Sequence, residues 1–233
     1  MELYEKESSE SRKDYAFRVL RDNIINLNLK PGQMLESENY LSEKLGVSRT
    51  PLREIIATLK NEGLVEVKSH VGTYIQYIDW SLIIEINFVK VLLEREVLKE
   101  AISKFPSKVL LELEKNLYLQ KFLLDVENSD NEFKELDEEF HKLLYKGVNK
   151  KFTWILSSKL NDNYKRFMNL AINSYDKNKI YSEHVQYIEI IKNKRINEVD
   201  CIVKKHIEDA FEVAKKEISQ DYDKMQYIQN YSF

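Results

Sequence analysis

Residues 45–65 constrain the fold more than any other segment, because they read as one short helix with two different faces. Apolar side chains recur at the i, i+3, i+4 and i+7 spacing of a helix that buries one side: Leu52, Ile55, Ile56 and Leu59. Arg49 and Arg53 are four residues apart, so they lie together on another face. The helix ends carry an N-cap, a first-turn residue and a C-terminal glycine, namely Ser48, Pro51 and Gly63. Such a helix fits the major groove of DNA.

The segments on either side complete a small domain. Helical periodicity is expected over residues 15–29 and again over 37–45, with turn signals after each. Downstream, residues 64–67 and 73–75 alternate like two short strands joined by a turn. Three helices followed by a hairpin predict a winged helix-turn-helix over residues 1–78.

Overall composition says less about nucleic acid than the local charge does. The net charge is −3, which does not by itself indicate a DNA-binding protein. Residues 44–60, however, concentrate basic side chains against the single acidic residue Glu54: Lys44, Arg49, Arg53 and Lys60. Attraction to phosphate acts over a Debye length of about 8–10 Å, so this local face matters more than the total.

The remaining composition indicates a soluble helical protein. Cys201 is the only cysteine, which excludes an intramolecular disulfide, and we expect it to be a small buried apolar residue. The chain is charged from Glu2 onward, so no signal peptide is expected. The apolar run over residues 80–93 is interrupted by Glu85 and Lys90 and is not a membrane span. These features predict a cytoplasmic location.

Residues 79–233 are expected to form an antiparallel all-helical bundle, which makes the whole chain mainly α. Helical patterns cover residues 79–105, 106–126, 131–147, 151–172, 177–194 and 196–219. Asp79 is the expected cap of the first helix, and no strand is expected in this region. The aromatic tail after Asp221 is expected either to fray or to pack on a partner subunit, with fraying favoured.

Three of the four histidines lie in this predicted bundle. Asp137 and His141 are at i and i+4 on one helix, whereas His184 and His206 belong to two further helices. Three imidazoles and one carboxylate from three helices can converge in a bundle core and bind a divalent ion such as Zn²⁺, Ni²⁺, Mn²⁺ or Fe²⁺. Taken singly, a helical histidine is more often a hydrogen-bonded structural residue or a surface residue than a metal ligand.

The N-terminal segment PGQMLESENYLSEKLGVSRTPLREIIATLKNEGLVEVKSHVGTYI resembles the DNA-binding domain of the GntR family of bacterial transcription regulators. The resemblance covers residues 12–76, and it implies DNA contacts from Ser48, Arg49, Thr50 and Arg53, with a wing at Gly72 that approaches the minor groove. Many relatives carry an arginine in the second helix where this chain has Asn39, so no contact is assigned to that position.

The C-terminal segments FVKVLLEREVLKEAI, LDEEFHKLLYKGVNKKF and SEHVQYIEIIKNKRINEVDCIVKKHIEDA resemble the FCD ligand-binding domain of FadR-type GntR regulators. The resemblance covers most of residues 80–218, and it implies metal ligands at Asp137, His141, His184 and His206. Lys90 stands before the Leu93-Glu94 pair, where many relatives carry an arginine. Lysine also carries a positive charge, but unlike arginine it cannot donate two parallel hydrogen bonds to one carboxylate. With Arg166 as a second cation, the expected effector is a small carboxylate.

Together the two resemblances imply a ligand-responsive repressor that binds a palindromic operator as a homodimer. Two alternatives stay open. In the first, the ion itself is the signal and the protein is a metal sensor. In the second, a metal-dependent enzyme is fused to a DNA-binding head. The second is disfavoured, because the chain has no His-Glu-x-x-His motif and no glycine-rich phosphate loop, and Glu138 with His141 forms only one Glu-x-x-His motif.

Overall fold

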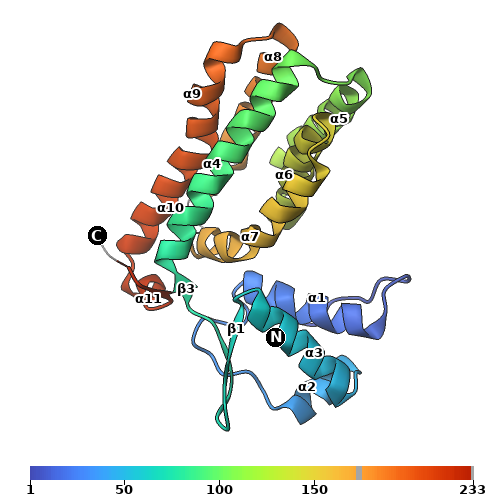
Figure 1. Ribbon diagram of the computed structural model, residues 1–233, viewed down its shortest axis with the longest axis vertical. Helices are drawn as coiled ribbons and strands as arrows, with labels where there is room; N and C mark the ends of the chain where they lie inside the picture. The colour runs from blue at the N-terminus through green and yellow to red at the C-terminus, as the bar shows by residue number, and fades with distance from the viewer. Residues whose placement is uncertain (172–174, 232–233) are drawn as a thin grey trace. The chain divides into compact units, whose positions relative to one another are not determined.

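The computed structural model describes residues 1–171 and 175–231, apart from the side chains of Lys159 and Asn161. The described residues are mostly helical and contain only short strands, so the expected mainly α class is confirmed (Figure 1). They form two compact units, each built from separate stretches of the chain. Unit 1 comprises Met1–Ile84, Lys159–Ile172 and Glu217–Phe233. Unit 2 comprises Glu85–Ser158 and Asn173–Lys216.

Unit 1 contains the winged helix-turn-helix. Helices α1 (Arg12–Ile25), α2 (Glu38–Leu45) and α3 (Arg49–Asn61) pack on one another. Strands β1 (Val65–Lys68) and β2 (Gly72–Ile75) follow and pair as an antiparallel hairpin, which carries the label β1 in Figure 1. The predicted order of three helices and a wing is therefore confirmed.

The sequence dictates these elements through caps and one apolar stripe. The Ser11 hydroxyl accepts a hydrogen bond from the Asp14 amide at the start of α1. Gly46 ends α2 in the left-handed conformation with φ 65°, which a residue without Cβ adopts at little cost. The whole predicted stripe of α3 is buried in the core of the head, namely Leu52, Ile55, Ile56 and Leu59.

Residues 221–231 of the C-terminal segment are folded. Asp221 caps the short helix α11 (Tyr222–Met225), and strand β4 (Ile228–Gln229) then pairs in parallel with β3 (Ile78–Asp79). The expectations of a frayed tail and of no strand after Asp79 are therefore wrong for these residues. The two residues of β4 pair with residues 150 positions earlier in the chain. No local sequence pattern predicts such a pairing. Phe233, also assigned to the tail, lies outside the described residues.

Unit 2 is the helical bundle. Its helices, some of which continue into unit 1, are α4 (Trp80–Ser103), α5 (Ser107–Leu124), α6 (Asp130–Gly147), α7 (Lys151–Leu170), α8 (Lys177–Asn193), α9 (Val199–Val203) and α10 (Asp209–Ser219). As expected, the Asp79 carboxylate accepts hydrogen bonds from the Ser81 and Leu82 amides at the start of α4. The last predicted helix is interrupted, because the 3₁₀ turn η2 (Ile196–Glu198) precedes α9 and the π-helical turn η3 (Lys204–Glu208) follows it.

Cys201 lies on the solvent side of α9. Val199, Ile202 and Val203 occupy the buried side of this helix, which leaves the cysteine exposed. The prediction that Cys201 is buried is therefore wrong, because one helical turn places it opposite the core stripe. Among the described residues, no helix combines the length and the apolar character needed to cross a bilayer.

Gly147, the last residue of α6, leaves room for the Phe105 ring. A Cβ built on Gly147 would lie 2.0 Å from a ring carbon of Phe105. We expect Gly147→Ala to lower the free energy of unfolding by about 1–3 kcal/mol, as overpacked cores do. Urea denaturation measures this change. In a Phe105→Ala background the same substitution should be neutral or stabilising; an equal loss in both backgrounds would contradict the packing explanation.

Candidate metal centre and nucleic-acid interface

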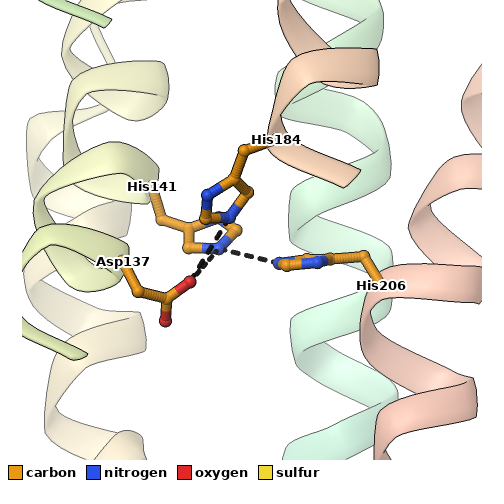
Figure 2. A group of neighbouring side chains, drawn as sticks. All are labelled: Asp137, His141, His184 and His206. Atoms are coloured by element: carbon orange, nitrogen blue, oxygen red, sulfur yellow. Dashed lines mark hydrogen bonds and ion pairs between the residues drawn. The ribbon is translucent and has the colours of Figure 1, made fainter. Parts of the chain in front are cut away.

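Three helical segments of unit 2 bring the four predicted ligands together. Asp137 and His141 lie one turn apart on α6, His184 lies on α8, and His206 lies on the π-helical turn η3. Figure 2 shows the four side chains pointing toward a common centre. One potential ligand atom from each lies within 4.8 Å of the other three.

The separations between these atoms fit ligands of one ion. The Nε2 atoms of His141 and His206 are 3.0 Å apart. The Asp137 Oδ1 atom lies 3.3 Å from His184 Nε2 and 3.7 Å from His141 Nε2. Two ligands that each lie about 2.0–2.2 Å from an ion are separated by roughly 3–3.5 Å. The cluster therefore has nearly the dimensions of a coordination sphere.

Each histidine is held by its other ring nitrogen. His141 Nδ1 lies 2.7 Å from a Glu94 oxygen, and His206 Nδ1 lies 2.9 Å from a Glu183 oxygen. A carboxylate can only accept, so both Nδ1 atoms donate. His184 Nδ1 donates over 2.8 Å to the Gln120 carbonyl oxygen.

The Gln120 amide is itself fixed in orientation. Its Nε2 group donates to the Asn116 side-chain oxygen over 2.7 Å, and Asn116 donates to the Leu136 carbonyl over 3.0 Å. This chain of donors leaves the Gln120 oxygen as the acceptor that faces His184. In its neutral form each of the three imidazoles therefore carries its proton on Nδ1 and directs an Nε2 lone pair toward the centre, which is the tautomer that binds a metal.

Converging lone pairs require a positive charge between them. The His141 and His206 lone pairs face each other over 3.0 Å, an arrangement that is repulsive unless a proton or a metal ion lies between them. The buried Nε2 atom of His184 makes no hydrogen bond, and an unsatisfied buried polar atom is costly. A divalent ion would satisfy both conditions, so the residues present fit the implied cofactor.

The ionisation of the centre follows from the same contacts. Burial lowers the pKa of His141, but Glu94 and Asp137 outweigh this effect and raise it to about 10. Burial lowers the pKa of His184 to about 3, although the Asp137 carboxylate, 3.3 Å from its Nε2 atom, opposes this shift. Burial raises the pKa of Asp137, yet its close contacts with His141 and His184 hold it well below its ordinary value. Without an ion, the centre therefore holds a proton on His141.

Aromatic packing and the π-helical turn set the directions of the rings. Phe140 stacks on the His184 ring with centroids 3.9 Å apart, and the His184 side chain is fully buried. His206 lies inside η3, where five-residue spacing widens the helix. Turns of this kind are frequent at functional sites. They point a side chain in a direction that it would not have in a regular α-helix.

The residues that orient the histidines were largely missed by sequence reasoning. Gln120 and Glu183 were not singled out, and Glu94 entered only as part of the Leu93-Glu94 pair. One signal was available for Glu183: it is an acidic residue next to His184, although it contacts His206 instead. Gln120 carried no signal, because its role depends on how α5 and α8 pack.

The structure places the two predicted effector cations differently. Lys90 is half-buried on α4, one turn before Glu94, and its charge is one of the smaller contributions that lower the Glu94 pKa. Arg166 is fully buried in unit 1, where it donates to the Gln76 carbonyl and the Asn163 side chain. These contacts all lie within unit 1, whereas the histidines belong to unit 2, so the role of Arg166 as an effector ligand stays a prediction.

The predicted DNA-contacting residues gather at the start of α3. Ser48, Arg49 and Thr50 are exposed, and Ser48 occupies the N-cap position without a side-chain capping bond. Arg53 is also exposed and pairs with Glu38 of α2 over 2.9 Å. Gly72 begins β2 in the wing. Basic and hydroxyl groups therefore line the exposed end of this helix.

Comparison with known proteins identifies both halves of the chain. The profile of bacterial regulatory proteins of the gntR family matches residues 13–75, and the FCD domain profile matches residues 85–209. The chain belongs to the gntR family and carries an FCD domain. The resemblances inferred from the sequence are confirmed, and the family consists of transcriptional regulators rather than enzymes.

Individual relatives agree with this assignment. The transcriptional repressor RspR of Escherichia coli is 30% identical over 138 residues, which are 59% of this chain and 60% of RspR. The gluconate operon transcriptional repressor of Bacillus subtilis is 26% identical over 75% of this chain and 73% of its own length. The chain thus spans about 60% of the length of the curated relatives it matches first.

Solved structures share the fold. Escherichia coli McbR/YncC has a TM-score of 0.70 at 18% identity, covering 89% of this chain and 99% of that one. A putative GntR regulator from Rhodococcus sp. RHA1 has a TM-score of 0.67 at 18% identity, covering 91% and 100%. At such identity the likeness supports the fold alone.

Metal binding should release a proton from His141. Above neutral pH this imidazole keeps its proton because its pKa is about 10, whereas Asp137 is ionised and His184 is neutral. We expect about one proton released per Zn²⁺ and an apparent affinity that rises about tenfold per pH unit between roughly pH 7.5 and 9. Calorimetry in buffers of different ionisation enthalpy measures both. No proton release and a flat pH profile would contradict this protonation state.

The carboxylate behind His141 should strengthen metal binding. Glu94→Gln keeps an acceptor for Nδ1 but removes a negative charge, so we expect Zn²⁺ affinity to fall about 10–100-fold. Glu96→Gln is the matched control, because Glu96 lies on the same helix and pairs with Lys99 at the surface. A competition titration with a chelating dye compares the two variants. Equal affinities would exclude the proposed role of Glu94.

Proposed function

We propose that the chain is a ligand-responsive DNA-binding transcription regulator that acts as a repressor. In this proposal residues 1–78 read DNA, and residues 79–233 bind a metal ion and an effector and form the dimer. The observation that carries it is the combination of an exposed reading helix with three Nε2 lone pairs that converge on one point. The matched gntR and FCD profiles support the same division of labour.

The reading helix would enter the major groove by its N-terminal end. Ser48, Arg49 and Thr50 lie at the positive end of the α3 dipole, which favours phosphate. Arg53, one turn later, would exchange its surface ion pair with Glu38 for a base or a phosphate. The wing at Gly72 would then approach the minor groove.

A homodimer on a palindromic operator follows from the modest charge of the chain. With a net charge of −3, tight binding needs two heads that act together on two half-sites. An exposed apolar stripe along α5 supports the dimer, because isolated apolar side chains rarely line up at helical spacing on a free surface: Leu111, Tyr118, Leu119 and Phe122.

The effector is proposed to be a small carboxylate held at an open position of the ion. Asp137, His141, His184 and His206 would be the protein ligands, and the ion would act as a Lewis acid for the effector oxygen. Asp137, Glu94 and Glu183 bring three carboxylates to the histidines. An anion can approach them only when a divalent ion and the nearby Lys90 supply opposing charge.

Binding of a carboxylate should therefore require the metal. We expect small carboxylic acids such as citrate and lactate, screened by thermal shift, to stabilise Zn²⁺-loaded protein and to have no effect on chelator-treated protein. Lys90→Ala should weaken the response, with Lys99→Ala as a surface control on the same helix. Equal stabilisation with and without metal would overturn the metal-assisted site. Rapid reversible metal binding with no carboxylate response would favour a metal sensor.

Loss of one arginine should show whether α3 reads bases. DNA selected from a random pool by the wild-type protein provides the target. We expect Arg49→Ala to weaken binding to this DNA by about 1–3 kcal/mol and to relax the selected sequence. Lys60→Ala, on the exposed side near the end of α3, is the control: loss of this charge should weaken binding at most equally on all DNA sequences and leave the selected sequence unchanged. Recovery of no enriched sequence by the wild type would refute the proposed function.

A further inference from the structure

The linker comprises residues 76–80, which run from the end of the wing to the first residue of α4. Each of these residues makes contacts within unit 1. Their partners come from three places: the head, the second half of α7, and the C-terminal segment 227–231. A linker that served as a free hinge would have exposed backbone and few contacts. This one has the opposite character.

The second half of α7 holds the beginning of the linker. Arg166 is fully buried, and its Nη2 group donates to the Gln76 carbonyl while Nη1 donates to Asn163 over 3.0 Å. The Gln76 amide donates to the Leu64 carbonyl over 3.0 Å, so both backbone polar groups of this residue are used. The neighbouring Tyr77 ring lies against Gly32, where a Cβ would meet the hydroxyl oxygen at 2.5 Å.

Two further contacts tie α7 to the head itself. Arg21 of α1 forms a bidentate ion pair with Asp162 through contacts of 2.7 and 2.5 Å. Asn169 donates to the Ile25 carbonyl at the end of α1 over 3.0 Å. A bidentate arginine–carboxylate pair fixes orientation as well as distance. The second half of α7 therefore belongs structurally to the head and its linker.

The C-terminal segment holds the end of the linker. The Ile78 amide donates to the Tyr227 carbonyl over 3.0 Å, within the parallel pairing of β3 with β4. One oxygen of Asp79 accepts a bond of 2.9 Å from the Asn230 side chain, and its other oxygen caps α4. A single carboxylate thus joins the C-terminal segment to the start of the bundle's first helix.

Trp80 contacts both α7 and the C-terminal segment. Its ring lies 5.8 Å from that of Phe167 on α7 and 4.9 Å from that of Tyr231 in the C-terminal segment, measured between centroids. The residue is only 3% exposed. Aromatic contacts at these distances add to the stability gained by burial. Loss of either neighbour would expose part of the Trp80 ring.

We propose that residues 76–80 form a clamped joint, which Arg166 and Phe167 of α7 and the C-terminal segment 227–231 hold closed. In its closed state the clamp fixes the orientation in which the head binds DNA that contains two half-sites. This inference rests on the proposed function. The connection to the candidate metal centre is α7 itself, since its residues up to Ser158 belong to unit 2 and the later ones to unit 1. In unit 2, Trp154 of α7 packs on Tyr145 of α6, the helix that carries Asp137 and His141.

Trp80 fluorescence tests the clamp without any ligand. The chain has two tryptophans, so Trp154→Phe leaves Trp80 as the only one. In this background we expect Tyr231→Ala and Asn230→Ala to shift the emission to longer wavelength and to speed chymotrypsin cleavage in the linker several-fold. Tyr222→Ala is the matched control, because Tyr222 lies in the preceding helix α11 and is 87% exposed. Unchanged emission and cleavage in Tyr231→Ala would overturn the clamp.

Operator binding tests the consequence of the clamp, with both tryptophans of the chain kept. With DNA selected by the wild-type protein, Tyr231→Ala should weaken binding to the two-half-site sequence roughly tenfold more than binding to one half-site, because the clamp preorganises the heads. Equal effects on both DNAs would overturn the regulatory role. If the wild type selects no DNA, the proposed function and this role fail together, while the fluorescence result still decides whether the clamp exists.

Discussion

The candidate site depends on one constraint, the convergence of three imidazole lone pairs on a single point. Hydrogen bonds from Nδ1 to Glu94, Gln120 and Glu183 fix the tautomers, so the Nε2 atoms of neutral imidazoles cannot donate to one another. The separation of 3.0 Å between two of them is stable only around a cation. A proton serves this purpose in the ligand-free protein, and a divalent ion would serve it better because it could bind the Asp137 carboxylate as well.

This constraint also determines how the bundle can respond to an effector. The ligands come from α6, α8 and η3, so a change in coordination acts on three helical segments at once. One of them, α6, packs through Tyr145 on Trp154 at the beginning of α7. The other end of α7 contacts the linker and α1. A coupling free energy of about 1–3 kcal/mol, typical of allosteric proteins, requires only small changes along such a path.

Much of the fold, but only part of the site, could be predicted from the sequence. The stripe containing Leu52 identified α3 because helix periodicity is local, and His184 was chosen for its type and its place in a helical pattern. Gln120 was missed because its role arises from packing between distant helices. Arg166 was assigned to the effector because periodicity cannot distinguish an arginine buried against a backbone carbonyl from one lining a pocket. Tyr231 was expected to fray because parallel pairing with residues 78–79 leaves no local signal.

We propose that the protein binds a divalent ion through its histidines, and X-ray absorption spectroscopy of protein reconstituted with one equivalent of Zn²⁺ measures this coordination. We expect nitrogen and oxygen ligands at about 2.0–2.2 Å, with the multiple-scattering pattern of imidazole. This imidazole signal should weaken in His184→Ala, the variant that removes the most buried ligand. A spectrum of fully hydrated zinc, or one unchanged by this substitution, would contradict the proposal.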